Sequence, residues 1–495
     1  MPHLGPRFVK IVFSVVALIL FSFAAVSSTP AQSVHAAELV RTSKPAIPVA
    51  ATTPASLVPN VAAPGTSLYV AHRGDSIPLV ARHYLSLTSY LTSSELSEAI
   101  RKANSDLHGN FLKSGQQIVI PGFLDAPIVE KSRPVPRDFE VRAVYLTGLM
   151  AGSDHGLRII RRWREAGGNS VVFDIKDSDG SVNIPFQHPL LGTHHTPLHD
   201  LPKFVRFLHS QNMHAIARVA IFRDERLVRE HPELAVKSHA SGEAWRENGK
   251  LVWTDPSQPK VQEYNIALAK RAAESGVDEV QFDYVRFPAE GNQKDASFVF
   301  QKDHPDWHRS DVIANFLQHA YAELHPTGVL LSLDVFGVMA WQRQVDLAHT
   351  GQDIPAMAKH CDVLSPMIYP SHFFGMDGYA RPGDAPEHFI GESMDRFLLI
   401  TKGSGVVIRP WLQAFRWRTK TYSPQYIETQ VLTSKNKGGI GFLFWNAAND
   451  YSKPFTAMPE MRASKDKYFR GDEFDDTDQA KAKPAGAQVI PTASR

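Results

Sequence analysis

Three apolar stretches of the sequence carry acidic residues where a buried strand would end. They read Val172-Phe173-Asp174-Ile175-Lys176-Asp177, Gln281-Phe282-Asp283-Tyr284 and Ser332-Leu333-Asp334. Side chains alternate between the two faces of a strand, so Gln281 and Asp283 share one face, as do Ser332 and Asp334. If these two strands are neighbours in the sheet, the carboxyl groups of Asp283 and Asp334 would lie close together. Such a pair can cleave a glycosidic bond, because one carboxyl protonates the leaving oxygen while the other attacks the anomeric carbon or activates water.

The predicted catalytic pair is Asp283 and Asp334. A separation of ~5–5.5 Å would give a retaining mechanism, and ~6.5–9.5 Å an inverting one. Arg218 or Arg286 would keep Asp283 ionised, because an adjacent cation lowers the pKa of a carboxyl group. The alternative is that these acids form structural Arg–Asp pairs inside the fold.

Aromatic residues follow several of the predicted strands, and indole and phenol rings stack on the apolar faces of pyranose sugars. All eight tryptophans lie at or after Trp163. One aromatic residue is more often part of the core, but five at predicted strand ends favour a sugar-binding rim. The residues predicted to bind substrate are Asp174, Lys176, Asp177, Arg218, Trp253, Gln281, Arg286, Trp341, Tyr369 and Trp445. Asp174 and Asp177 are also the alternatives to Asp334 as the proton donor.

Eight short apolar strands alternate with amphipathic helices in the second part of the chain. The predicted strands are Val141–Leu149, Ser170–Asp177, Ala215–Phe222, Glu279–Phe287, Leu330–Gly337, Val363–Tyr369, Val407–Phe415 and Gly439–Asn446. Eight βα units in about 320 residues predict an α/β fold of the (β/α)8 TIM-barrel type, whose working residues lie at the C-terminal ends of the strands. Neither GxGxxG nor GxxxxGK[ST] follows the first strand, so a nucleotide site is not predicted.

Several of these stretches resemble a bacterial family of glycosyl hydrolase domains, long described as a domain of unknown function. The most specific is Asp278-Glu279-Val280-Gln281-Phe282-Asp283-Tyr284-Val285-Arg286-Phe287-Pro288, and the resemblance covers most of residues 140–450. The family is related to α-amylase-like barrels. That relation implies an aspartate nucleophile on the fourth strand, which falls on Asp283. Those barrels usually have a glutamate acid on the fifth strand, where this chain has the shorter Asp334.

Residues 67–123 predict a separate small βααβ unit. Gly74-Asp75-Ser76 opens one helix, Asn104 closes another, and Leu112–Gln117 leads into a final strand. This pattern resembles a LysM module, which implies binding to peptidoglycan or another glycan that contains N-acetylglucosamine. A structural unit without affinity for glycans is the alternative.

The chain begins with a predicted export signal. Arg7 and Lys10 precede an apolar run from Ile11 to Val26, and small residues follow up to Ala36. We expect a signal peptide at 1–36, with an uncleaved membrane anchor as the alternative. The remaining predicted segments are a linker at 37–66, the LysM-like module at 67–123, a proline-rich connector at 124–139, the barrel at 140–462 and a disordered tail at 463–495. The predicted location is the periplasm, the cell envelope or the medium.

Composition and motifs limit the other functions. Lys plus Arg is 53 against 51 for Asp plus Glu, and no long basic run occurs, which argues against a nucleic-acid partner. The single Cys361 excludes an internal disulfide framework. A loop with four histidines (His188, His194, His195 and His199) leaves a zinc-dependent polysaccharide deacetylase open, although HExxH is absent.

Together these patterns predict an exported glycoside hydrolase that needs no cofactor and cleaves O-glycosidic bonds in an envelope or extracellular polysaccharide. Two alternatives remain open. One is a non-catalytic wall-binding protein that holds glycan at the barrel rim, and the other is the metal-dependent deacetylase.

Overall fold

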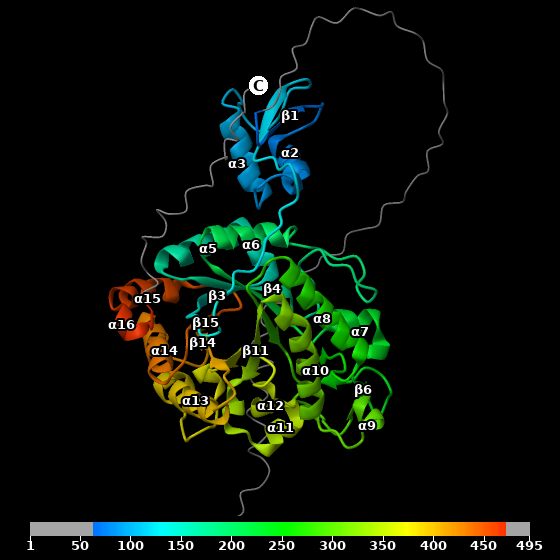
Figure 1. Ribbon diagram of the computed structural model, residues 1–495, viewed down its shortest axis with the longest axis vertical. Coiled ribbons are helices and arrows are strands. Elements are labelled where there is room, and N and C mark those ends of the chain that lie inside the picture. Colours follow the sequence, from blue (N-terminus) through cyan, green and yellow to red (C-terminus); the bar gives the residue numbers. More distant parts are fainter. Residues whose placement is uncertain (1–62, 472–495) are drawn as a thin grey trace, which may run out of the picture. The chain divides into compact units, whose positions relative to one another are not determined.

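The computed structural model describes residues 63–471, which divide into two compact units at residue 127. The predicted signal peptide, the linker up to residue 62 and the tail after residue 471 lie outside the described residues. Within residues 63–471, no helix is both long and apolar enough to cross a membrane. The two units are described separately below (Figure 1).

The first unit has the predicted βααβ order. Its elements are β1 (Thr66–Val70), α2 (Ile77–Tyr84), the 3-10 turn η1 (Leu85–Leu87), α3 (Ser93–Ala103) and β2 (Gln117–Pro121). The two strands are antiparallel, and the helices bury Ile77, Leu96 and Ile100 against them. The amide of Asn104 exchanges two 2.8 Å hydrogen bonds with the backbone of Val119, which ties the end of α3 to β2.

The second unit is a closed parallel barrel. Its strands are β3 (Arg142–Leu146), β4 (Ser170–Lys176), β5 (His214–Ala220), β9 (Glu279–Asp283), β11 (Leu330–Phe336), β12 (Val363–Met367), β13 (Val407–Ile408) with β14 (Trp411–Gln413), and β15 (Phe442–Trp445). β15 pairs with β3 and β11 with β12, so the sheet closes on itself. β13 and β14 share the seventh position and are separated by Arg409 and Pro410, since proline has no N–H for the ladder. The predicted (β/α)8 fold is confirmed, and every predicted strand overlaps an observed one.

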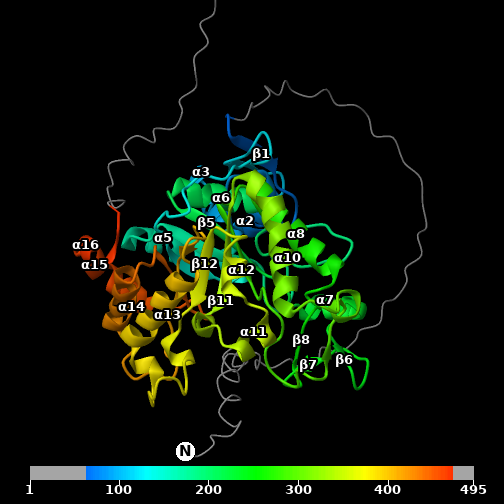
Figure 2. The same ribbon diagram turned by 60° about the horizontal axis from the view of Figure 1, so that its bottom comes forward.

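Helices surround the strands of this unit (Figures 1 and 2). The main ones are α5 (Asp154–Ala166), α6 (Leu201–Ser210), α8 (Pro259–Glu274), α10 (Arg309–Leu324), α13 (Pro386–Ile400), α14 (Pro424–Asn436) and α15 (Ser452–Ala463). In α5, Ser153 caps the N-terminus by accepting from Gly156 N, and Gly167 ends the helix with φ 109°. The helix buries Ile160 and Trp163 against the strands, as its amphipathic pattern requires.

Short elements fill the loops and the C-terminal end. The short helices are α4 (Gly148–Ala151), α7 (Glu225–Glu230), α9 (Phe300–Asp303), α11 (Gln344–Thr350), α12 (Ile354–Met357) and α16 (Lys465–Tyr468). The short strands are β6 (Lys237–Ser238), β7 (Arg246–Glu247), β8 (Leu251–Val252) and β10 (Ala296–Ser297). The 3-10 turns are η2 (Pro232–Leu234), η3 (His325–Thr327), η4 (Gly337–Trp341), η5 (Pro370–His372) and η6 (Pro382–Asp384). The barrel unit extends beyond the predicted boundary at residue 462, because Phe469 is buried and its ring centroid lies 5.2 Å from the guanidinium carbon of Arg142.

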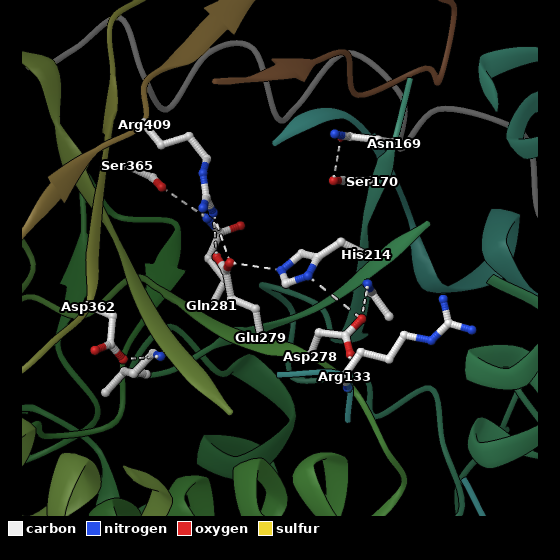
Figure 3. A network of polar contacts seen from close by, with 12 residues as sticks. Arg133, Asn169, Ser170, His214, Asp278, Glu279, Gln281, Asp362, Ser365 and Arg409 are labelled. Atoms are coloured by element: carbon white, nitrogen blue, oxygen red, sulfur yellow. Dashed lines mark hydrogen bonds and ion pairs between the residues drawn. The ribbon is translucent and has the colours of Figure 1, made fainter. Parts of the chain in front are cut away.

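A buried ionic network occupies the N-terminal end of the barrel (Figure 3). Arg409 Nη1 contacts both carboxylate oxygens of Glu279, at 2.9 and 2.8 Å, and His214 Nε2 lies 3.1 Å from Glu279 Oε2. Burial alone would raise the pKa of Glu279, but Arg409 and His214 lower it to about 2. This end of the barrel is therefore held by paired charges, and the candidate site lies at the other end.

Candidate active site

Arg218 on β5 contacts three carboxylates at the C-terminal end of the barrel. Its Nη1 lies 2.5 Å from Asp174 Oδ1, its Nη2 donates to Asp283 Oδ2, and its Nε lies 3.5 Å from Asp334 Oδ2. The three acids come from β4, β9 and β11, and all four residues are buried. The alternation of strand side chains thus brings Asp283 and Asp334 to one guanidinium, as the sequence predicted. One cation against three acids leaves a surplus of carboxyl groups here.

Asp283 is the least buried of these three acids, at 7% exposure against 1% for Asp174 and Asp334. Its Oδ1 accepts from the backbone N–H of Tyr284 at 2.5 Å, while its Oδ2 accepts from Arg218. Tyr284 has φ 53°, in the left-handed region, so the chain turns sharply directly after the carboxylate. Both oxygens of Asp283 are therefore held in place at the mouth of the barrel.

Asp334 is enclosed by the barrel wall. Its Oδ1 accepts from Trp411 Nε1 at 2.6 Å. Burial is the main cause that raises the pKa of Asp334 well above its usual range, and the charge of Asp283 adds to it, while Arg218 and Trp411 oppose the shift. Burial therefore favours the protonated form of Asp334, and solvent barely reaches the side chain in this conformation.

Asp177 follows β4 and is a second carboxyl group with a raised pKa. Burial, the charge of Asp174 and a hydrogen bond to Asp174 raise the pKa of Asp177 to about 9. Its Oδ2 accepts from Asn183 Nδ2 at 2.9 Å. Unlike Asp334, Asp177 is only partly buried. It is therefore a carboxyl group that holds a proton at neutral pH and is also accessible.

Lys176 does not lie with the acids that flank it in sequence. β4 contains a bulge, because Asp174 pairs with Arg218 and Lys176 pairs with Val219, the next residue of β5. The fully buried ammonium lies 2.8 Å from Asp224 Oδ2 and donates to Asn265 of α8 at 3.0 Å. Lys176 therefore contacts the surrounding helix layer, and this position does not support the prediction that it binds substrate.

Two more residues that were predicted to bind substrate are fully buried. Gln281 is fully buried inside the barrel, two residues before Asp283, and donates to Ser365 Oγ at 3.2 Å. Trp253 is also fully buried, and its Nε1 donates to Glu247 Oε2 at 2.9 Å. Neither side chain is free to stack on or bind a sugar, so their positions favour supporting roles.

The predicted aromatic residues have different neighbours. The ring of Trp445 is half-buried, and its centroid lies 5.3 Å from the guanidinium carbon of Arg218. Tyr369 is buried, and the charges of Asp334 and Asp283 add to burial in raising its pKa. Trp341 instead lies 4.9 Å from the guanidinium carbon of Arg396 on α13. Trp445 and Tyr369 thus border the site.

Two functional candidates were missed from the sequence. The first is Tyr145 on β3, which donates to Asp174 at 2.5 Å and packs against Trp445 with ring centroids 4.1 Å apart. The second is Trp411 on β14, which donates to Asp334. An aromatic residue inside an apolar strand normally indicates core packing, so the sequence carried no signal for these polar contacts.

Two of the four histidines considered as zinc ligands contact other groups. The ring centroids of His188 and Tyr264 are 5.1 Å apart, and His194 Nε2 lies 3.0 Å from the carbonyl oxygen of Ile184. Asp200 caps α6 by accepting from Lys203 N at 2.9 Å. In the part of the chain from 63 to 471, no three His, Cys, Asp or Glu side chains are grouped as metal ligands. The deacetylase alternative thus gains no ligand set from these residues.

A family profile described as "Putative glycosyl hydrolase domain" matches residues 143–451. The chain belongs to this family. The glycosyl hydrolase domain spans the barrel from β3 to the loop before α15 and includes Arg218 with its three acids. The predicted resemblance is confirmed, and the barrel is that of a glycoside hydrolase.

Solved structures also resemble this glycosyl hydrolase. A hypothetical protein from Ruminiclostridium thermocellum ATCC 27405 is 37% identical over 39% of this chain and 97% of its own, with a TM-score of 0.35. The PgaB (BpsB) glycoside hydrolase domain from Bordetella bronchiseptica is 16% identical over 67% and 99%, with a TM-score of 0.49. The α-galactosidase TtGalA from Thermus thermophilus is 14% identical over 72% and 68%, with a TM-score of 0.42. No curated protein matches the chain.

Proposed function

We propose that the protein is an exported glycoside hydrolase that cleaves O-glycosidic bonds in a cell-envelope or extracellular polysaccharide. The observation that carries the proposal is that Asp283 and Asp334 contact one guanidinium, that of Arg218, while burial raises the pKa of Asp334. Glycosidic hydrolysis requires one charged and one protonated carboxyl group, and different surroundings separate the two roles. Export rests on the predicted signal at residues 1–36.

Asp283 is the carboxylate that acts at the anomeric carbon. It is the most accessible of the acids that contact Arg218, and its Oδ2 accepts a hydrogen bond from that guanidinium. In the reaction, the C–O bond to the leaving sugar breaks while Asp283 attacks the carbon or takes a proton from the attacking water. Water is consumed, and each fragment ends as a hydroxyl-bearing sugar.

Asp177 is the better placed proton donor. It combines a pKa of about 9 with partial exposure, so it can pass its proton to the leaving oxygen. Asp334, the donor predicted from the sequence, remains the second candidate. Asp334 is 1% exposed and accepts from Trp411, so its side chain would have to move to reach a glycosidic oxygen.

The test is reducing-end release by the full chain from α- and β-glucans, exopolysaccharides and peptidoglycan. We expect turnover of one polymer, lost by a factor of ~10³ or more in Asp283→Asn. Asp395→Asn, on the exposed face of α13, is the matched control and should match the wild type. Equal turnover by Asp283→Asn and the wild type would overturn the assignment. Polymer retained by all variants without turnover would favour the binding-protein alternative.

The proton donor can be identified separately with aryl glycosides of the sugar found in that screen. A good leaving group needs no protonation, so loss of the true donor should slow the polymer far more than the aryl glycoside. We expect this pattern for Asp177→Asn. The same pattern in Asp334→Asn alone would transfer the role to Asp334.

The first unit is proposed to hold the enzyme on its substrate. Its βααβ order supports the LysM-like assignment made from the sequence. Sedimentation of the full chain with insoluble peptidoglycan, in competition with N-acetylglucosamine oligomers, tests this role. Release by the oligomers is expected, and retention that they do not affect would contradict it.

A further inference from the structure

Arg286 is a buried cation near the candidate site, and the residues that the structure describes give it no ion-pair partner. It lies three residues after Asp283 and is 7% exposed. Its guanidinium carbon lies 4.6 Å from the ring centroid of Trp253 and 4.3 Å from that of Phe336, and its Nη1 donates to Phe287 O at 3.0 Å. Among residues 63–471, it has no carboxylate within ion-pair distance. Burying a guanidinium without a counter-ion is unfavourable, so such a group points to a ligand.

Neighbouring acids act on Arg286 only from a distance. Burial lowers the pKa of Arg286, and Glu247 gives the strongest opposing effect. Both oxygens of Glu247 are already used, because Oε2 accepts from Trp253 Nε1 and Oε1 accepts from the N–H groups of Ala289 and Glu290. The guanidinium of Arg286 therefore keeps hydrogen-bonding capacity that no carboxylate among residues 63–471 takes.

Arg223, in the loop after β5, is a second cation beside Tyr284, and it is only partly buried. Its guanidinium carbon lies 5.3 Å from the ring centroid of Tyr284, and that of Arg286 lies 5.6 Å from the same centroid. Nη1 of Arg223 donates to Tyr284 Oη at 3.0 Å and to Ser178 Oγ at 3.3 Å. The described residues give Arg223 no carboxylate partner either. Two like charges thus flank one ring, directly after Asp283.

We propose that Arg286 and Arg223 bind a carboxylate on the substrate, so that the polysaccharide contains acidic sugars such as hexuronates. This inference rests on the proposed hydrolase function and specifies its substrate class. A guanidinium presents parallel N–H donors that match a carboxylate, and the half-exposed ring of Tyr284 can support the apolar face of the same sugar. The acidic sugar then lies beside Asp283.

Calorimetric binding to the full chain carrying Asp283→Asn tests the inference without turnover. The probes are oligosaccharides of polygalacturonate, polyglucuronate and alginate, each with its carboxyl-reduced neutral counterpart. We expect one acidic oligosaccharide to bind at least ~10-fold more tightly than its neutral form. Adding Arg286→Met should weaken binding of the acidic form by ~10- to 100-fold, with the neutral form changed less than about twofold. Equal affinity for acidic and neutral forms of every probe would overturn the inference.

Arg309→Met is the matched control. Arg309 also lies against aromatic rings, those of Phe287 and Phe298, but it donates to Gln293 Oε1 and to the carbonyl oxygen of His349. Its replacement should leave the preference for acidic probes unchanged. Loss of the preference in Arg309→Met as large as in Arg286→Met would show a general structural effect and would contradict the inference.

Reducing-end release by the wild type from the same polymers separates this inference from the proposed function. Tight, Arg286-dependent binding of acidic oligosaccharides without turnover would uphold the inference and reject the hydrolase. Turnover of neutral polymers alone would uphold the hydrolase and reject the inference. Tighter binding of sulfated than of carboxylated oligosaccharides would also reject the carboxylate assignment.

Discussion

The hydroxyl of Tyr145 on β3 donates a 2.5 Å hydrogen bond to Asp174 Oδ2 on β4, and the other oxygen of Asp174 contacts Arg218 on β5. Asp174 therefore connects an uncharged donor on one side to the guanidinium on the other. Because Arg218 also binds Asp283, a change at Tyr145 can reach the proposed catalytic carboxylate without touching the substrate.

We predict that Tyr145→Phe lowers kcat/KM by about 10-fold, because it removes a hydrogen bond to a charged group while keeping the ring against Trp445. The matched control is Tyr321→Phe, which removes the 3.3 Å hydrogen bond from Tyr321 to Asp362. Steady-state kinetics on the polymer identified above would measure both variants. Equal rates in Tyr145→Phe and the wild type would contradict the proposed link.

Arg218→Met should destabilise the barrel by about 3–5 kcal/mol at pH 7, because it leaves three buried acids without their cation. Urea unfolding at pH 7 measures the deficit. Arg206→Met, which removes the pair of the exposed Arg206 with the partly buried Glu130, should cost less than about 1 kcal/mol. An equal deficit in Arg218→Met and Arg206→Met would argue against buried charge as the cause.

The sequence predicted the fold and most of the polar cluster. Alternation along the strands correctly placed Asp283 and Asp334 together, because both strands are regular up to these residues. It could not place Lys176, because one extra residue in β4 turns this side chain toward the helices and hydrophobic patterning does not reveal such a bulge. It also left open whether Arg218 or Arg286 holds Asp283, since that choice depends on how the turn at Tyr284 directs the chain.

Asp177→Asn should stabilise the protein increasingly as pH rises. The unfolded chain releases the Asp177 proton near its ordinary pKa of 3.8, whereas the folded protein keeps it to about 9. Ionisation therefore favours the unfolded state between these values, and the wild type loses stability with rising pH. The gain at pH 8 relative to pH 4 should be on the order of 5 kcal/mol, measured by urea unfolding. Asp395→Asn, an exposed site paired with Lys437, is the control and should change stability by less than about 1 kcal/mol.

Glu279→Gln should destabilise the barrel by about 3 kcal/mol at pH 7, because it leaves Arg409 buried without its counter-ion (Figure 3). The pKa of Glu279 is lowered to about 2, so its contribution is complete above about 4.5 and is lost as pH falls toward 2. Urea unfolding at pH 7 and pH 3 should therefore show a smaller difference between variant and wild type at pH 3. A difference that grows at low pH would contradict this assignment.

The contacts of Arg218 also bear on how the barrel opens. One guanidinium joins β5 to acids on β4, β9 and β11, which are consecutive in the sheet, whereas the seventh position is interrupted at Arg409 and Pro410. Local opening draws on the least stable parts of a structure. Backbone amides of the four joined strands should thus exchange with deuterium together and late, and those around β13 and β14 earlier. The backbone amides in one half of the barrel wall would then exchange slowly, and those in the other half quickly.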